Sequence, residues 1–152
     1  MIVSNLAKAL RELTADVLKD LRLPVKNGEP RSPNIFNCYL PPKRSESDDD
    51  FPFVTVALDS GEIDTSYSAI NVSFIIGCYT REYDGHEYCL TVFERLTRSL
   101  CGLPGGLLKG RYILHYPLKW ELLQEQPYPQ WQMRIETEWS YEAPQREYQE
   151  EM

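Results

Sequence analysis

Residues 130–141 read QWQMRIETEWSY and alternate polar with mostly apolar side chains, without a break, over 12 residues. A period of two predicts a β-strand with one buried face. The strand is about twice the usual ~5–6 residues. Leu118, Trp120 and Leu122 alternate in the same way before a loop at 124–129. We therefore expect a hairpin that carries all three tryptophans and supplies much of the core.

Two further strands are expected upstream of this hairpin. Residues 53–58 read FVTVAL, which is β-branched and apolar and is typical of a central strand. Asp59-Ser60-Gly61 then predicts a turn. Every second residue from Ile70 to Cys78 is apolar, which predicts a half-buried antiparallel strand over residues 70–79. Residues 35–40 predict a short strand or an anchored loop.

Two helices are expected, one before these two strands in the sequence and one after them. The first has an apolar stripe, with Ser4 as its N-cap and Pro24 as its end. The second begins at Asp84, with Glu87 completing a capping box, and ends at Gly102 and Pro104. The stripes consist of Leu6, Leu10, Leu13, Val17 and Leu21 in the first, and Cys89, Val92, Phe93, Leu96 and Leu100 in the second.

This order of elements predicts an α+β fold. We expect an antiparallel or mixed β-sheet of about four or five strands, with both helices packed on one face. Residues 1–142 are predicted to form a single domain that includes a long Pro-rich loop at 24–52. Residues 43–50 contain no apolar side chain and are expected to be mobile, and residues 143–152 are expected to form a disordered acidic tail.

Composition excludes several classes of function. The chain has 152 residues, 42% of them hydrophobic and 26% charged, with a net charge of −7. No apolar run approaches the ~20 residues that span a bilayer, so no membrane association is expected. Lysine and arginine are not clustered, which argues against sequence-specific binding of nucleic acid.

The residues that could carry chemistry do not form a recognisable site. Cys38, Cys78, Cys89 and Cys101 lack zinc-site spacing, and His86 with Cys89 lacks two further ligands. Spacing alone leaves open a Cys–His nucleophile that uses Cys89 or Cys101 with His115. The Asp48–Asp50 run lacks an EF-hand pattern, although a weak divalent cation at a subunit junction stays open. We expect no catalytic residues, no metal and no cofactor.

A family resemblance supplies a function. The Gly-rich exit from the second helix, the strand start Pro117-Leu118-Lys119-Trp120-Glu121 and the long final strand resemble the tail terminators of tailed bacteriophages. This family includes the minor tail protein U of lambda-like phages and related tail-completion proteins, and the resemblance covers about residues 3–142. It implies a non-enzymatic virion protein at the tail–head junction, assembled in the cytoplasm of the host bacterium. Such subunits close into a hexameric ring on the tail tube, stop its polymerisation and present a head-joining surface.

The partners follow from the same resemblance: further copies of the chain, the tail tube protein and head–tail connector proteins. A long strand that ends in exposed aromatic residues at a sheet edge would also need cover from another chain. In such a ring the wall of the lumen would be acidic, so DNA would pass through without binding to it. Candidate contacts are the loop at 24–52 and residues 61–68. The individual candidates are Asp48, Asp49, Asp50, Glu62, Asp64, Tyr67, Arg134, Glu136, Glu138 and Trp139.

Three alternatives stay open from sequence. Another phage neck or head-completion protein would share this size and ring assembly. A general protein-interaction module of a bacterium would show no association with virions. A small hydrolase that uses Cys89 or His115 would lose its function when these residues are replaced with alanine.

Overall fold

The α+β prediction is confirmed by the computed structural model, which describes residues 2–40, 50–123 and 128–142. Within these ranges six strands form one curled sheet in the order β1-β2-β3-β6-β5-β4. β1 pairs with β2 in parallel and the other neighbours are antiparallel. The elements are α1 (Ile2–Leu18), β1 (Asn34–Asn37), β2 (Phe53–Ile63), β3 (Tyr67–Tyr79), α2 (His86–Cys101), the 3-10 turn η1 (Pro104–Gly106), β4 (Leu107–Leu108), β5 (Tyr112–Leu122) and β6 (Gln130–Glu142).

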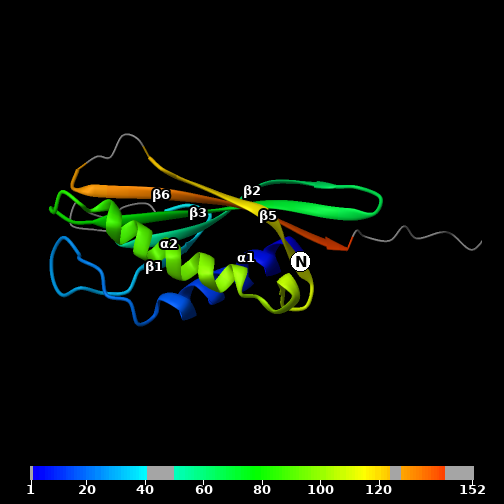
Figure 1. Cartoon of the computed structure of the whole chain (residues 1–152), viewed down its shortest axis with the longest axis horizontal. Coiled ribbons are helices and arrows are strands. Elements are labelled where there is room, and N and C mark those ends of the chain that lie inside the picture. The colour runs from blue at the N-terminus through cyan, green and yellow to red at the C-terminus, as the bar shows by residue number, and fades with distance from the viewer. Residues whose placement is uncertain (1, 41–49, 124–127, 143–152) are drawn as a thin grey trace, which may run out of the picture.

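Both helices lie on the same face of the sheet (Figure 1). The main core fills the space between them and the sheet, and its largest fully buried side chain is Trp139. Both predicted helix stripes point into this core. The fully buried members include Leu6 and Leu10 from α1, Val92 and Leu96 from α2, and Phe74, Ile76, Met133 and Ile135 from β3 and β6.

The helix ends differ from the predicted ones. α1 begins at Ile2, so Ser4 lies inside it rather than at its N-cap. The buried hydroxyl of Tyr112 donates a hydrogen bond to the Ile2 carbonyl, which fixes this first turn. α1 ends at Leu18, well before Pro24, and Leu23 beyond its end forms a bridge with Arg31.

The predicted capping box of the second helix does not form. α2 begins at His86 with Gly85 as its N-cap, and no side chain caps it. A Cβ at position 85 would overlap the indole of Trp131, so close packing takes the place of a capping side chain. The predicted end at Gly102 is confirmed, because the backbone N–H of Gly102 donates to the Arg98 carbonyl and that of Leu103 donates to the Leu100 carbonyl.

The turn predicted at Asp59-Ser60-Gly61 is wrong. β2 continues to Ile63, and a β-bulge between Leu58 and Ser60 shifts its pairing register with β3. The chain reverses only after Ile63. There the backbone N–H of Asp64 donates to the Tyr67 carbonyl, and the Asp64 carboxylate accepts from the backbone N–H of Thr65. Pairing with β3 therefore overrides a turn-forming tripeptide.

β6 is a central strand, which corrects the expectation of an exposed aromatic edge. It lies between β3 and β5, and Trp139 is 0% exposed. The predicted alternation in β6 is confirmed, since Met133, Ile135 and Trp139 are all buried on the helix side. The expected strand at 118–122 is the second half of β5, which begins earlier at Tyr112 and has a bulge between His115 and Lys119.

The face of the sheet without helices is apolar at one end. Phe51, Phe53 and Tyr79 form a second buried cluster, with Phe36 and Ile75 packed against it. β3 is therefore buried on both faces at this end and not half-buried along its whole length, as its alternation predicted. Beyond this cluster the same face is polar.

The expectations for residues 43–49, for the loop at 124–127 and for the tail at 143–152 lie outside the described residues. The short strand expected at 35–40 is observed as β1. Within the described ranges no helix is long and apolar enough to cross a membrane.

Candidate interaction surface

The β2–β3 hairpin runs past the end of β1, and β6 accompanies its inner strand β3 as far as Tyr67, which pairs with Glu142 (Figure 1). β1 pairs with residues 53–56 of β2, and from residue 57 to Ile63 no described strand lies on the outer side of β2. We call residues 57–70 the arm. Its tip is exposed and includes two large side chains, Ile63 at 71% and Tyr67 at 41% exposure. An open strand edge of this kind is a template for pairing with another chain.

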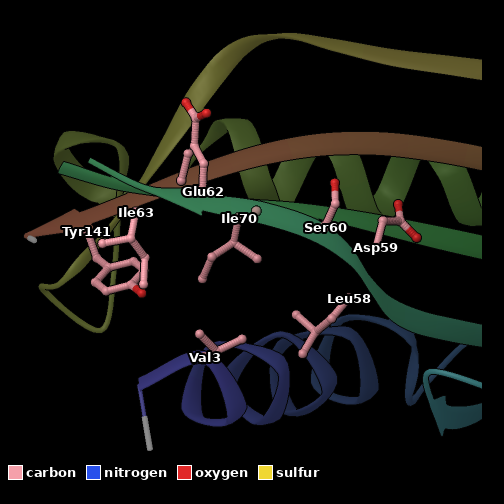
Figure 2. A pocket seen from close by; sticks show the side chains of 10 residues that line it. Val3, Leu58, Asp59, Ser60, Glu62, Ile63, Ile70 and Tyr141 are labelled. Atoms are coloured by element: carbon pink, nitrogen blue, oxygen red, sulfur yellow. The ribbon is translucent and has the colours of Figure 1, made fainter.

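An apolar groove of about 520 Å³ lies between the arm and the start of α1. Figure 2 shows Leu58, Ile63 and Ile70 pointing from the arm toward Val3 of α1, while Asp59, Ser60 and Glu62 point the other way. Tyr141 of β6 closes one end of the groove. The bulge explains this division of side chains, because it places Asp59 and Ser60 in succession on the face opposite to Leu58.

A polar network covers the helix-free face beside the arm. The guanidinium of Arg134 on β6 lies 3.3 Å from the carboxylate of Asp59 and donates to the Ser73 hydroxyl at 2.9 Å. Ser73 also donates to Asp59, and Arg134 lies 3.5 Å from Glu136. Asp59, Arg134 and Glu136, with Lys119 and Glu138, line a polar hollow of about 440 Å³. The network ties the bulge of β2 to β3 and, across β3, to β6.

Glu62 and Tyr67 face one another across the arm. The Tyr67 hydroxyl donates to the Glu62 carboxylate at 3.1 Å. This hydrogen bond and the negative charge of Glu62 raise the pKa of Tyr67 above its ordinary value. The arm carries a further carboxylate, Asp64, at its tip, so its exposed end is acidic.

The structure brings the predicted contact residues together in two groups and leaves the remaining four outside them. Glu62, Asp64 and Tyr67 meet on the arm, and Arg134, Glu136 and Glu138 lie together on the polar face. Asp48 and Asp49 lie outside the described residues, and Asp50 is half-buried, its carbonyl accepting from Asn34. Trp139 is wrong as a contact residue, because its ring lies in the core and donates to Thr137.

Sequence reasoning missed the apolar half of this surface. Leu58 was assigned to a strand, whereas Val3, which precedes the predicted N-cap, and Ile63 were not singled out. Ile63 is the one large apolar residue between Gly61 and Ser66, and such an isolated position in a polar stretch is the signal that could have drawn attention to it. The groove itself depends on how α1 packs, which no local pattern reports.

The residues considered for catalysis are Cys89, Cys101 and His115, and the structure gives a local environment for each of them. Cys89 is buried and its thiol lies 3.4 Å from the Trp131 carbonyl, while a hydrogen bond with Cys89 and burial raise the pKa of Cys78. His115 is hydrogen-bonded to Ser140 at 2.6 Å and lines neither the groove nor the polar hollow. Cys101 is exposed. Among the described residues no three histidine, cysteine or acidic side chains form a metal-binding group.

The chain matches no known family model, and no curated protein is significantly similar to it.

Proposed function

We propose that this chain is a tail terminator of a tailed bacteriophage or prophage. In this proposal it is a structural protein without catalytic activity that assembles with copies of itself into a ring, six subunits being the number that the family resemblance implies. The ring caps the last layer of the tail tube, ends tube polymerisation and presents a surface to the head connector.

One observation carries the proposal: the open outer edge of β2 beside an apolar groove. The arm exposes Ile63 and leaves its strand edge without a partner among the residues that the structure describes. Soluble proteins usually protect such edges, so the arrangement favours a chain whose normal state includes a neighbour. The α+β architecture agrees with what the resemblance implies about fold.

Deletion of the gene from the phage or prophage that carries it tests the proposal. Electron microscopy of the lysate should show tail tubes longer than those of the parent, with normal heads. Expression of the intact chain from a plasmid should restore the parental length, and an unrelated protein of similar size expressed from the same plasmid should not.

Two other results would contradict termination. Filled heads beside separate tails of normal length would place the protein in the neck. Particles that the deletion leaves unaltered would indicate that the protein has no role in the virion and would favour a general interaction module.

A further inference from the structure

We propose that Cys78 and Cys89 form an intramolecular disulfide when the folded chain meets a small-molecule disulfide such as oxidised glutathione. The bond would tie the end of β3 to the first turn of α2. This inference goes beyond the proposed function and does not depend on it, because it concerns the core of a single subunit.

Both thiols lie in the main core, where the first turn of α2 packs on the end of β3. Each of the two cysteines is 0% exposed. Cys78 shares the helix side of the sheet with Phe74 and Ile76, because alternate residues of a strand point to the same side. Cys89 is one of the buried residues of α2. The strand therefore directs the Cys78 side chain toward the helix that carries Cys89.

Trp131 fixes the position of Cys89 relative to Cys78. The Cys89 thiol donates to the Trp131 carbonyl at 3.4 Å, and Trp131 is the residue directly opposite Cys78 in the β3–β6 ladder. Opposite residues of an antiparallel ladder have their Cα atoms about 4.5–5.5 Å apart. The Cys89 thiol therefore lies over the Cys78–Trp131 pair.

A hydrogen bond joins the two thiols directly. Because Cys89 donates its proton to the Trp131 carbonyl, Cys78 is the donor in the bond between the thiols. This hydrogen bond and burial hold the proton on Cys78 and raise the pKa of its thiol. The two sulfur atoms are therefore neighbours, and we expect Cys89 to react first and Cys78 second, since the thiolate is the reactive form.

The first turn of α2 gives an oxidant access to the pair. No side chain caps this helix, and residues 81–84 before it are exposed. Helix ends open locally at a lower free energy than the core of a sheet. Opening of this turn would bring Cys89 to the surface while β3 stays paired on both sides.

The reaction consists of two thiol–disulfide exchanges. The Cys89 thiolate attacks one sulfur of oxidised glutathione, forms a mixed disulfide and releases one glutathione thiolate. Cys78 then loses its proton, attacks the Cys89 sulfur and releases the second glutathione thiolate. The two protein thiols are oxidised, the oxidant is reduced to two molecules of glutathione, and the two protons end on the released thiolates. The bond would be open in a reducing compartment and closed in an oxidising one.

A variant that contains only these two cysteines tests the pairing. Cys38→Ser with Cys101→Ser replaces one half-buried and one exposed thiol and leaves both buried thiols in place. The folded variant is incubated with oxidised glutathione, then unfolded and alkylated. It should have lost both alkylation sites, and peptide mapping should identify a Cys78–Cys89 crosslink. Two free thiols, or mixed disulfides alone, would overturn the proposal.

An equilibrium comparison shows whether the fold itself favours the bond. In glutathione buffers, the ratio of disulfide to dithiol should be at least about tenfold higher in the folded variant than in the same variant in urea. The reason is that only the folded chain holds the two thiols together. An equal or lower ratio would mean that closeness in sequence explains the crosslink, and it would overturn the proposal.

A matched control moves the second thiol along α2. Adding Cys89→Ala and Thr91→Cys to the two-cysteine variant places this thiol at an exposed position, at nearly the same separation in sequence from Cys78. Circular dichroism shows that the control is folded. Its ratio of disulfide to dithiol should be no higher in the folded state than in urea, and a ratio as high as that of the Cys78–Cys89 pair would contradict the assignment.

The crosslink should also stabilise the chain. It closes the loop of residues 79–88 in the unfolded state, so the thermal midpoint of the oxidised two-cysteine variant should lie several degrees above that of the reduced one. The oxidised form can be prepared in urea and refolded, which makes this measurement independent of access to the buried thiols. A lower midpoint in the oxidised form would show that the fold opposes the bond and would overturn the proposal.

Discussion

Tyr112 links the first turn of α1 to the sheet by a single hydrogen bond to the Ile2 carbonyl. We predict that Tyr112→Phe lowers the free energy of unfolding by about 0.5–1.5 kcal/mol, the usual net value of one such bond. Urea unfolding at neutral pH measures this loss. Tyr39→Phe, at a position 82% exposed, is the control and should leave the unfolding midpoint unaltered. An equal loss in both variants would contradict the assignment.

The same residue gives a pH dependence with a defined sign. Burial raises the pKa of Tyr112 above its ordinary value of 10.0, so the folded state holds the proton more tightly than the unfolded chain does. Its contribution to stability is therefore complete below about pH 10 and is lost as the pH rises further. We expect the difference in stability between the unaltered chain and Tyr112→Phe to narrow above pH 10, as measured by unfolding in parallel buffers. A difference in stability between the two proteins that widens above pH 10 would contradict this expectation.

Gly77 on β3 allows the ring of Phe53 to cover the helix-free face of the sheet. A Cβ at position 77 would overlap this ring. We predict that Gly77→Ala destabilises the fold by about 1–3 kcal/mol, because the buried Phe53 must move. Combining it with Phe53→Leu should relieve part of this loss, which a double-mutant cycle of unfolding free energies measures. Additive losses would show that the strain comes from the backbone instead.

At the scale of elements, Arg134 holds the bulge of β2 against β3 and β6 through Asp59 and Ser73. These groups are partly exposed, so we predict that Arg134→Ala lowers global stability by no more than about 1 kcal/mol. Its main effect should be local, as faster hydrogen exchange at the backbone amides of residues 58–63. Lys119→Ala is the control, since it lies on the same polar face but in no ion pair with a described residue. Equal exchange in the two variants would contradict this role.

Elements with a long apolar period were predictable from sequence, and their irregular features were not. Leu6, Leu10 and the residues of β6 lie where their spacing placed them, because one buried face repeats over many residues. The passage of β2 through Asp59-Ser60-Gly61 was not predictable, since that tripeptide favours a turn and only pairing with β3 keeps it extended. The start of β5 at Tyr112 was missed because its buried residues follow directly on the Gly-rich segment.

At the scale of the whole molecule, strand order decided which candidate contacts could be right. Glu62, Asp64 and Tyr67 are close in sequence, so local reasoning could group them, and the arm does bring them together. The prediction that Trp139 is a contact residue depended on β6 being an edge strand. β6 pairs on both sides, with β3 and with β5, over contacts that are distant in sequence. No local pattern reports such pairings, so the long amphipathic strand was mistaken for an interface when it is the centre of the core.

The arm itself should be dispensable for folding and necessary for assembly. Replacing residues 62–69 by Asn-Gly would join Gly61 to Ile70, which already lie opposite one another in the β2–β3 ladder, and Asn-Gly favours a two-residue hairpin turn. The variant removes six exposed residues together with Ser68 and Ala69, which are buried and pair with Tyr141 and Ser140 of β6, and it retains Ile70 over the core. The buried apolar side chain that leaves is the small one of Ala69, so we expect the thermal midpoint to fall by only a few degrees.

Assembly, by contrast, should be lost at every concentration at which the unaltered chain associates, because Ile63, Glu62 and Asp64 all leave together. Native mass spectrometry and thermal unfolding of the same preparation measure the two effects. A second variant that replaces residues 26–29 by Asn-Gly shortens an exposed segment at a different site and should retain assembly. If the arm variant unfolded like a chain with a damaged core, the arm would be part of the folding unit. If it assembled normally, the ring would have to form through other surfaces, and the acidic tip would be left without a role in joining copies.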